Sequence, residues 1–395
     1  MSKIIKPITL YRLVLGAFVL KCLDIIRVDG MRPLVHATGD IEMYVRDGAT
    51  GFATRGWNAT AWLPVYPTYE IHSSIEKLKV NHVYAHQFAG PDYLLGLWFN
   101  IFGTSDTAFQ WARLLPLSLL ILSFTYWIKT LSKFSTFKWG WAAPFLVLAV
   151  LYLPAMIPWA VQLGSEAYGS ACVLFVLAWT QNQNSNQKSK NITQNTLLTG
   201  LLLGALSLLA YMPLCFVIVS IPLAFRFLTG RFLRRFDFQL STALGLGMVL
   251  LFVLRLAQLT HYLGSFSDAI QSQIDIAKYR IGGPETVVLP STIRMFGIYS
   301  LAVRGFFRFG SITMLLTGFF GVYLLSISLR EKANMALSLV VATTSAYVWV
   351  LLVRGYAMAH THFHPRSFLF LYLIWILVWV RVATDRDISQ KKNNI

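Results

Sequence analysis

Long apolar segments alternate with short polar connectors along most of this chain. About 20 apolar residues span the hydrocarbon region of a bilayer, so the pattern predicts transmembrane helices. Ten are expected, near residues 8–27, 106–128, 140–157, 166–181, 196–210, 212–228, 238–259, 311–328, 335–353 and 365–382. The chain is therefore predicted to be an all-α polytopic membrane protein, with residues 1–395 forming a single integral-membrane domain.

Two stretches between the predicted helices, residues 28–105 and 260–310, are longer and more polar than the others. Within the first, residues 92–102 are apolar all round but too short to cross a bilayer, which predicts a short helix lying in the membrane interface. Within the second, residues 264–291 have apolar positions near helical spacing as far as Gly282. This pattern predicts an amphipathic segment, which we expect to cover a site on that side.

Basic residues gather at one end of the predicted helices, and this distribution orients the chain. Short basic loops remain in the cytoplasm, so both termini are predicted to be cytoplasmic and the two long stretches periplasmic or exterior. The basic residues on the cytoplasmic side are Lys3, Lys6, Lys129, Lys133, Lys138, Lys188, Lys190, Arg226, Arg231, Arg234, Arg235, Arg330, Lys332, Arg381, Arg386, Lys391 and Lys392. No small-residue cleavage site follows the first apolar segment, which predicts an uncleaved helix in a bacterial-type inner membrane.

Composition supports the same class of protein. Hydrophobic residues make up 56% of the chain and charged residues 13%, which is typical of a polytopic membrane protein and argues against a soluble globule. The net charge of +17 is explained by the basic loops, and no basic, aromatic-interleaved soluble region is present for binding nucleic acid. The three cysteines lie in apolar runs and predict neither a disulfide framework nor a metal site.

Residues suited to chemistry gather on the predicted outer side. All eight histidines are expected there: His36, His72, His82, His86, His261, His360, His362 and His364. The acidic residues Asp40, Glu42, Asp92 and Glu166 are expected there too. Histidines that served only in packing would not sort by side, so the outer face is predicted to be the chemical face.

The stretch 39-GDIEMYVRDG-48 brings carboxylates one step beyond the first predicted helix. Asp40 and Glu42 would share a face of an extended segment but point apart on a helix. A partly desolvated carboxylate at the membrane rim can act as a general base, and an ordinary solvated loop acid is the alternative. Arg113 lies inside a predicted helix, where an unpaired charge costs about 2.5–3.5 kcal/mol. It therefore requires a carboxylate, a phosphate or a water-filled cavity.

Four motifs follow one another along the chain. GDIEMY keeps the Asp and Tyr (Asp40 and Tyr44) of an Asp-Glu-x-x-Tyr motif with the acid displaced to Glu42, and HQFAGPDY contains His86, Pro91 and Tyr93. QLGSEAYGS places Glu166 at the outer start of a helix, and HTHFHPRSF leads into the last helix with Ser367 at a position expected to be Tyr. Their order resembles that of the GT-C glycosyltransferases, in particular the branch of protein O-mannosyltransferases and lipid A aminoarabinose transferases. The resemblance is weak between Glu166 and the last outer loop.

The resemblance implies transfer of a sugar from a polyprenyl-phosphate donor to a protein, lipid or glycan acceptor on the outer face, with inversion. Asp40 is expected to be the general base, with Glu42 and Glu166 as further catalytic acids. The leaving phosphate needs permanently charged donors, for which the candidates are Arg366, Arg308, Arg304, Arg280 and Lys278. The candidates for contact with sugar or acceptor are His86, His82, Tyr44, Tyr93, Asp92, His362 and His364.

Several alternatives stay open at this point. No cofactor is expected to be required, although the alternating histidines at 360–364 are candidate ligands of a divalent metal. Arg304 and Arg308 also suit a snorkelling pair on an interfacial helix, and Arg255 either lines a cavity or pairs locally. A polytopic transporter or flippase of a lipid-linked or anionic substrate, or a polysaccharide ligase, would share many spans and isolated charges. Against a transporter, no repeated half is visible and ionisable residues are sparse in the predicted mid-membrane region.

Overall fold

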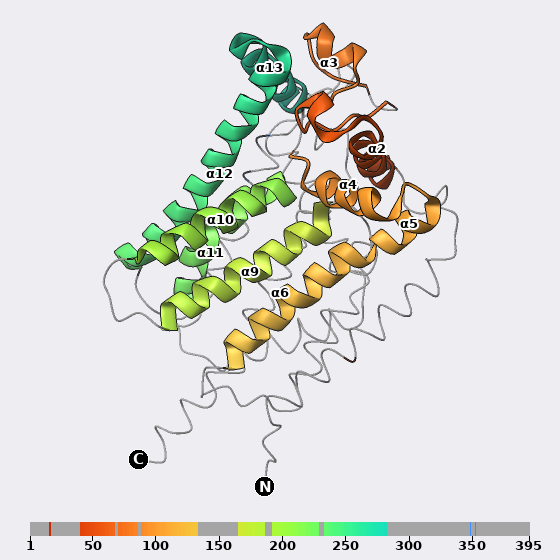
Figure 1. The fold of residues 1–395 in the computed structure, drawn as a ribbon. Helices are drawn as coiled ribbons and strands as arrows, with labels where there is room; N and C mark the ends of the chain where they lie inside the picture. Colours follow the sequence, from red (N-terminus) through yellow and green to blue (C-terminus); the bar gives the residue numbers. More distant parts are fainter. Residues whose placement is uncertain are drawn as a thin grey trace, which may run out of the picture.

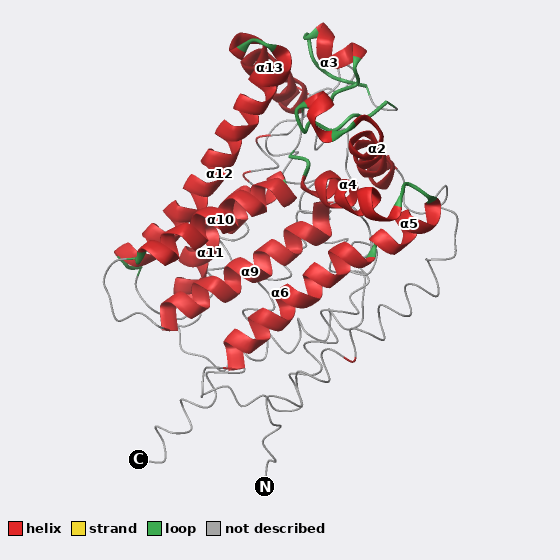
Figure 2. Ribbon diagram, viewed as in Figure 1, coloured by secondary structure: helices red, strands yellow, loops and turns green. Residues whose placement is uncertain are grey.

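The computed structural model describes residues 40–67, 70–85, 88–132, 165–185, 192–228 and 233–282, together with Gly16, Val348 and Leu352. This part of the chain is helical and contains no β-sheet (Figure 2). Among the described residues, β pairing is limited to an isolated antiparallel bridge between Val65 and Val83. The predicted all-α class is therefore confirmed for these residues.

Five of the predicted long helices lie within the described ranges, and all five are found. They are α6 (Leu114–Ser132), α9 (Ser165–Ser185), α10 (Gln194–Ala210), α11 (Cys215–Leu228) and α12 (Arg235–Leu263). The shorter elements are α2 (Asp40–Arg55), η2 (Trp57–Thr60), α3 (Glu76–Val80), α4 (Gly90–Phe102), α5 (Asp106–Ala112), η3 (Met212–Leu214) and α13 (Phe266–Gly282). The helices predicted near 8–27, 140–157, 311–328, 335–353 and 365–382 fall outside the described segments.

Two stretches of the described chain are long and apolar enough to cross a membrane by length and composition, Asp106–Trp127 and Arg235–Leu263. The first corresponds to the helix predicted at 106–128, but it is divided into α5 and α6 at Arg113. Arg113 is the C-cap of α5, and its side chain is buried at this junction. Large apolar side chains of α12, Leu250 and Leu254 among them, are exposed, as is expected of a helix side that contacts lipid.

Helices α10 and α12 cross with their backbones in direct contact. A Cβ atom added at Gly204 would overlap the carbonyl oxygen of Leu244, and one added at Gly247 would overlap that of Leu201. Gly200 and Gly204 form a Gly-x-x-x-Gly motif, the small-residue pattern that lets membrane helices approach closely. This crossing therefore depends on the absence of side chains at a few positions.

The connection between α11 and α12 contains a buried ion pair. The Arg226 Nε atom lies 3.4 Å from Asp237 Oδ2, and both side chains are almost fully buried. Asp237 also caps α12 by accepting a hydrogen bond from the Arg234 backbone N–H at 2.9 Å. Arg226, which was predicted among the basic residues of the cytoplasmic side, lies in the last turn of α11 with its side chain buried. It is buried because a carboxylate is available to pair with it.

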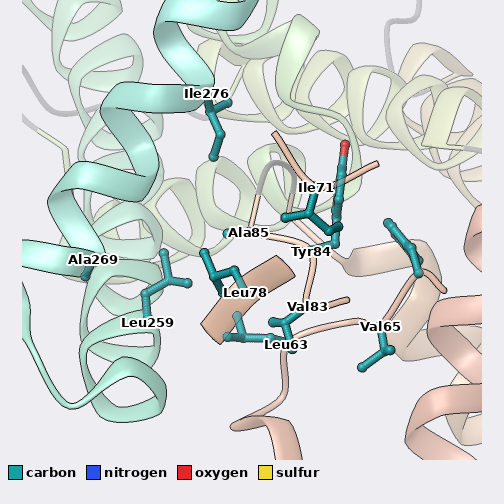
Figure 3. Packing of buried hydrophobic residues seen from close by; sticks show 11 residues of the cluster. Leu63, Val65, Ile71, Leu78, Val83, Tyr84, Ala85, Leu259, Ala269 and Ile276 are labelled. Carbon is teal, nitrogen blue, oxygen red and sulfur yellow. The ribbon is translucent and has the colours of Figure 1, made fainter. Parts of the chain in front are cut away.

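The remaining elements gather at one end of the helical bundle, where α12 ends and α9 begins (Figure 1). There residues 63–85, α12 and α13 form a small hydrophobic core, against which Tyr44 of α2 packs. Figure 3 shows Leu63, Leu78 and Val83 of this core facing Leu259 and Ala269 from α12 and α13. The two long stretches predicted to share one side, in their described parts, therefore meet in a common core.

Candidate functional site

Residues 40–55 form the helix α2, which decides between the two arrangements open for its acidic residues. Positions 40 and 42 are two residues apart on a helix and so lie on different sides of it. Positions 40, 44 and 48 follow one another along a single side, because residues four apart face the same way. Asp40, the first residue of α2, therefore shares its side with Tyr44 and Gly48.

That side of α2 contacts a buried pair of side chains. The Tyr66 hydroxyl donates a hydrogen bond of 2.7 Å to Asp92 Oδ1, and both residues are buried. The rings of Tyr44 and Tyr66 lie 5.9 Å apart between centroids. A Cβ atom at Gly48 would lie 2.7 Å from Tyr66 Cε1 and would overlap Asp92 Oδ1. Glycine is thus required where α2 approaches the pair.

Burial changes the proton affinity of this pair. Removal from water raises the pKa of Asp92 to about 7, although the Tyr66 hydrogen bond and the Arg255 charge act in the opposite direction. Burial, followed by the nearby Asp92 charge, also raises the pKa of Tyr66 well above its ordinary value. A carboxyl group that titrates near neutrality can exchange a proton under physiological conditions. Asp92 was predicted to contact sugar or acceptor, and in the structure it is buried with the Tyr66 hydroxyl as its hydrogen-bond partner.

Arg255 of α12 pairs locally, which was one of its two predicted roles. Its guanidinium donates to the Tyr84 carbonyl oxygen at 3.1 Å and to Gln258 Oε1 at 3.0 Å. Gln258 in turn donates to the Ala61 carbonyl oxygen at 2.7 Å. The end of α12 is thereby fixed to residues 61 and 84. Both belong to the outer segment, that is, the described part of residues 28–105, which the sequence predicts to lie outside the membrane.

Tyr93, one residue after Asp92, lies on the other side of α4. Its hydroxyl donates to the Trp62 carbonyl oxygen at 2.8 Å, and its ring is 5.5 Å from that of Phe52 and 6.0 Å from that of Trp57. Phe52 and Trp57 stack with centroids 4.4 Å apart. Tyr93 is therefore part of an aromatic group that joins α2 to α4.

The start of α9 reaches the same region. Glu166 is its second residue. Tyr168, two residues after Glu166, is buried. Tyr168 is close enough to Asp92 for the two groups to interact electrostatically. Helix α4 also packs against α9. Asp40 and Glu166 therefore belong to two helices that both contact the surroundings of Asp92.

Three other predicted residues have different surroundings. Lys278 is exposed on α13, one helical turn beyond Asp275. Arg280 Nη1 lies 3.7 Å from Met212 Sδ. His82 is exposed in the turn after α3, and its carbonyl oxygen accepts a hydrogen bond from the Tyr66 backbone N–H at 2.9 Å. The structure thus places these three side chains in residues 76–82 and α13 and does not join them to the Tyr66–Asp92 pair.

The remaining predicted residues lie outside the described side chains. For Asp40, Glu42 and Glu166 the structure describes the backbone position alone. His86, Arg304, Arg308, Arg366, His362 and His364 fall outside the described residues. Within the described residues, no group of three His, Cys, Asp or Glu side chains is arranged to hold a metal ion.

Helix α13 is seated on the outer segment. Asp275 accepts hydrogen bonds from the Ser74 backbone N–H at 2.7 Å and from the Ser74 hydroxyl at 2.6 Å. The rings of His72 and Tyr279 stack with centroids 3.8 Å apart. The helix ends at Gly282, where the sequence pattern predicted the end of the amphipathic segment. Its contacts hold it against residues 72–74.

No protein-family model, curated protein or solved structure matches this chain. Any proposal about function must therefore rest on the sequence and on the geometry of the site.

Sequence analysis missed Tyr66 and Gly48, which complete the surroundings of Asp92. Tyr66 follows Leu63 and Val65 in a short buried extended stretch, and this pattern was a signal for a buried side chain. Gly48 lies within the helix α2, and an isolated glycine within a helix often marks a close contact with a neighbouring segment. Neither of these sequence signals shows that Asp92 is the residue contacted, because Tyr66 and Asp92 are 26 residues apart in sequence.

Proposed function

We propose that this chain is a GT-C type membrane glycosyltransferase with about ten transmembrane helices, as its apolar pattern predicts. It transfers a sugar from a polyprenyl-phosphate donor to an acceptor on the outer face of the membrane. The observation that carries the proposal is the meeting of α2, α4 and the start of α9 around Asp92. This arrangement supports a common site for Asp40 and Glu166, two acids that belong to separate motifs of the family.

In the proposed reaction, the Asp40 carboxylate takes the proton of an acceptor hydroxyl. The acceptor oxygen forms a bond to the anomeric carbon as the bond from that carbon to the phosphate oxygen breaks. Polyprenyl phosphate leaves with the electron pair of the broken bond, and in-line attack inverts the configuration. Permanently charged guanidinium groups stabilise the leaving phosphate, for which Arg366 is the first candidate.

The Tyr66–Asp92 pair has a positioning role in this proposal. It contacts α2 at Tyr44 and Gly48, one and two helical turns beyond Asp40. Catalytic groups must be held in place by neighbours whose own positions are fixed by packing and hydrogen bonds. The buried pair, tied to α4 through Asp92, meets that requirement for the first turns of α2.

The test is the substitution Asp40→Asn in purified protein assayed against a panel of polyprenyl-phosphate sugars. Loss of a general base lowers the rate by roughly 10²- to 10⁴-fold, so we expect transfer to fall at least 100-fold while donor binding is retained. Glu76→Gln, on the exposed side of α3, is the matched control and should leave transfer unchanged.

Normal transfer by Asp40→Asn would remove Asp40 as the base. A transporter or flippase would instead show substrate flux that depends on an ion gradient, with no glycosylated product. That outcome would contradict the glycosyltransferase proposal as a whole.

A further inference from the structure

A cleft opens at the end of α2 that is opposite to Asp40. It has a volume of about 430 Å³ and lies where the end of α2, η2, α3 and the end of α12 meet. The side chains that matter for its chemistry are Arg55, Asn58, Lys77, Asn81, His261 and Tyr262. They come from three separate parts of the chain, residues 55–61, 77–81 and 261–262, so only the folded protein brings them together.

The lining of this cleft is cationic. Arg55 and Lys77 contribute permanent positive charges, and His261 contributes an imidazole. Among the described residues, no carboxylate lines the cleft. Guanidinium, ammonium and amide groups that converge without an acid form the usual environment of a bound oxyanion.

Part of the lining is held in place before any ligand arrives. The Lys77 ammonium donates to the Tyr262 carbonyl oxygen and lies 4.7 Å from the centroid of the Tyr262 ring. Asn81 Nδ2 donates to the Tyr262 hydroxyl at 2.9 Å. Asn58 Oδ1 accepts a hydrogen bond from Trp62 Nε1 at 3.2 Å, so the amide group of Asn58 keeps a fixed orientation. Fixed donors bind a ligand with less loss of side-chain entropy.

The backbone beside the cleft is strained. Ala61 and Trp62 are consecutive residues other than glycine with positive φ angles of 50° and 65°. Such residues persist only where the surroundings hold them, and they cluster at binding sites and active sites. Ala61 lines the cleft, and its carbonyl oxygen is held by Gln258. The strain is thus located at the cleft wall.

The cleft is remote from the proposed reaction centre. Helix α2 has 16 residues, and with a rise of 1.5 Å per residue its two ends are about 22 Å apart. A phosphate in contact with Arg55 at one end cannot be the group that leaves beside Asp40 at the other. The cleft is therefore a second site.

We propose that this cleft binds a phosphate group, as free phosphate or as the headgroup of an anionic lipid. Donors from α2, η2, α3 and α12 approach from several directions, which suits the oxygen atoms of a tetrahedral anion. The site includes the last turn of α12 through His261 and Tyr262, so it lies at the end of the bundle from which α13 continues.

The test uses the full-length protein purified in a neutral detergent. Radiolabelled inorganic phosphate is the first probe, measured by equilibrium dialysis at low salt. We expect saturable binding that is at least tenfold weaker in Arg55→Gln and unchanged within twofold in Lys79→Gln. Lys79 is an exposed neighbour on α3 that does not line the cleft, which makes it the matched control.

The second probe separates the two sources of phosphate. Phosphatidylglycerol, with phosphatidylcholine as its control, is added to the protein with bound labelled phosphate. If phosphatidylglycerol releases the labelled phosphate and phosphatidylcholine does not, the cleft binds a lipid headgroup. If neither lipid releases the labelled phosphate, the cleft binds free phosphate.

Two results would overturn the proposal: no saturable binding of either probe, or equal binding by the unsubstituted protein and Arg55→Gln. If Arg55→Gln fails to fold, as judged by its melting temperature, His261→Gln takes its place with the same expected weakening. Because these measurements need no sugar transfer, they can fail while the glycosyltransferase proposal stands, and the reverse also holds.

Discussion

The crossing of α10 with α12 and the outer segment around Tyr66 are stabilised in different ways. In the crossing, backbone meets backbone at Gly204 and Gly247, and the outward side of α12 carries exposed leucine and valine side chains. In the outer segment, a compact core that includes Leu63 and Leu78 is joined to hydrogen bonds and stacked rings.

Close van der Waals contact between small residues is the way in which helices associate where there is no hydrophobic driving force between them, as in lipid. Burial of apolar side chains, with partners for the polar groups buried beside them, is the way in which a fold is stabilised in water. The α10–α12 crossing shows the first kind of packing, and the core around Leu63 and Leu78 shows the second.

The largest expected effect distinguishes an ion pair in the bundle from one in the outer region. Arg226→Gln leaves the buried Asp237 carboxylate without its partner and should lower the free energy of unfolding by about 3–5 kcal/mol. The comparison is Arg46→Gln, which removes the exposed pair between α2 and α5 and should cost less than about 1 kcal/mol. Denaturation of both variants in detergent measures the difference, and similar losses would contradict it.

The second prediction concerns the helix crossing. Gly204→Ala places a methyl group against the Leu244 carbonyl oxygen, and overpacking of this kind costs about 1–3 kcal/mol. Gly245→Ala is the matched control on α12, where the nearest atom to the new methyl group is Val219 Cγ2 at 4.0 Å. The melting temperature in detergent should fall for the first variant and stay level or rise for the second. Equal melting temperatures would show that the backbones do not touch.

The third prediction tests the buried acid of the outer segment through pH. Because burial raises the pKa of Asp92 from 3.8 to about 7, the folded state holds its proton more tightly than the unfolded chain does. The contribution of Asp92 to stability is therefore full below pH 4 and is lost as the pH rises to about 7. Asp92→Asn keeps an acceptor for Tyr66 but cannot titrate. The difference in unfolding free energy between the two proteins should change across that window, and a constant difference would exclude the shift.

The smallest expected effect has the opposite sign. Partial burial tends to raise the pKa of Asp275, but the hydrogen bonds from Ser74 and Gln271 outweigh it and lower that pKa overall. Asp275 therefore stabilises the folded protein above pH 4 and loses this contribution as the pH falls below its unfolded value. Asp275→Asn should reduce stability at neutral pH and have little effect in acid. Hydrogen exchange of α13 amides measures the change, and faster exchange in acid alone would contradict the assignment.

The long helices could be predicted because their signal is local. Apolar runs of sufficient length placed α9, α10, α11 and α12 within a few residues of their observed bounds, and the short run at 92–102 located α4. The helix predicted at 106–128 is divided into α5 and α6. The sequence left the helical form of α2 open, and Gly48 and Gly51 lower helix propensity within it. The contact of Gly48 with Tyr66 and Asp92 explains that glycine, and it is visible only in the folded chain.

The sequence could indicate which residue types belong to the candidate site, but not which side chains contact one another there. Asp92 and Tyr93 were both expected to contact sugar or acceptor, but adjacent residues of a helix point in different directions. Asp92 contacts Tyr66, and Tyr93 contacts the aromatic group around Trp57. Arg226 was predicted only as one of the basic residues of the cytoplasmic side, since its partner Asp237 belongs to the next helix.

By itself, the sequence determined the helical class of the described residues and the positions of the long apolar helices among them. These properties depend on composition and period, which act over one or two helical turns. Tertiary structure alone decided which acid is buried, which arginine is paired, and that Arg55, Lys77 and His261 line one cleft. Burial and charge pairing depend on residues far apart in the chain, and only the packed helices bring those residues within contact.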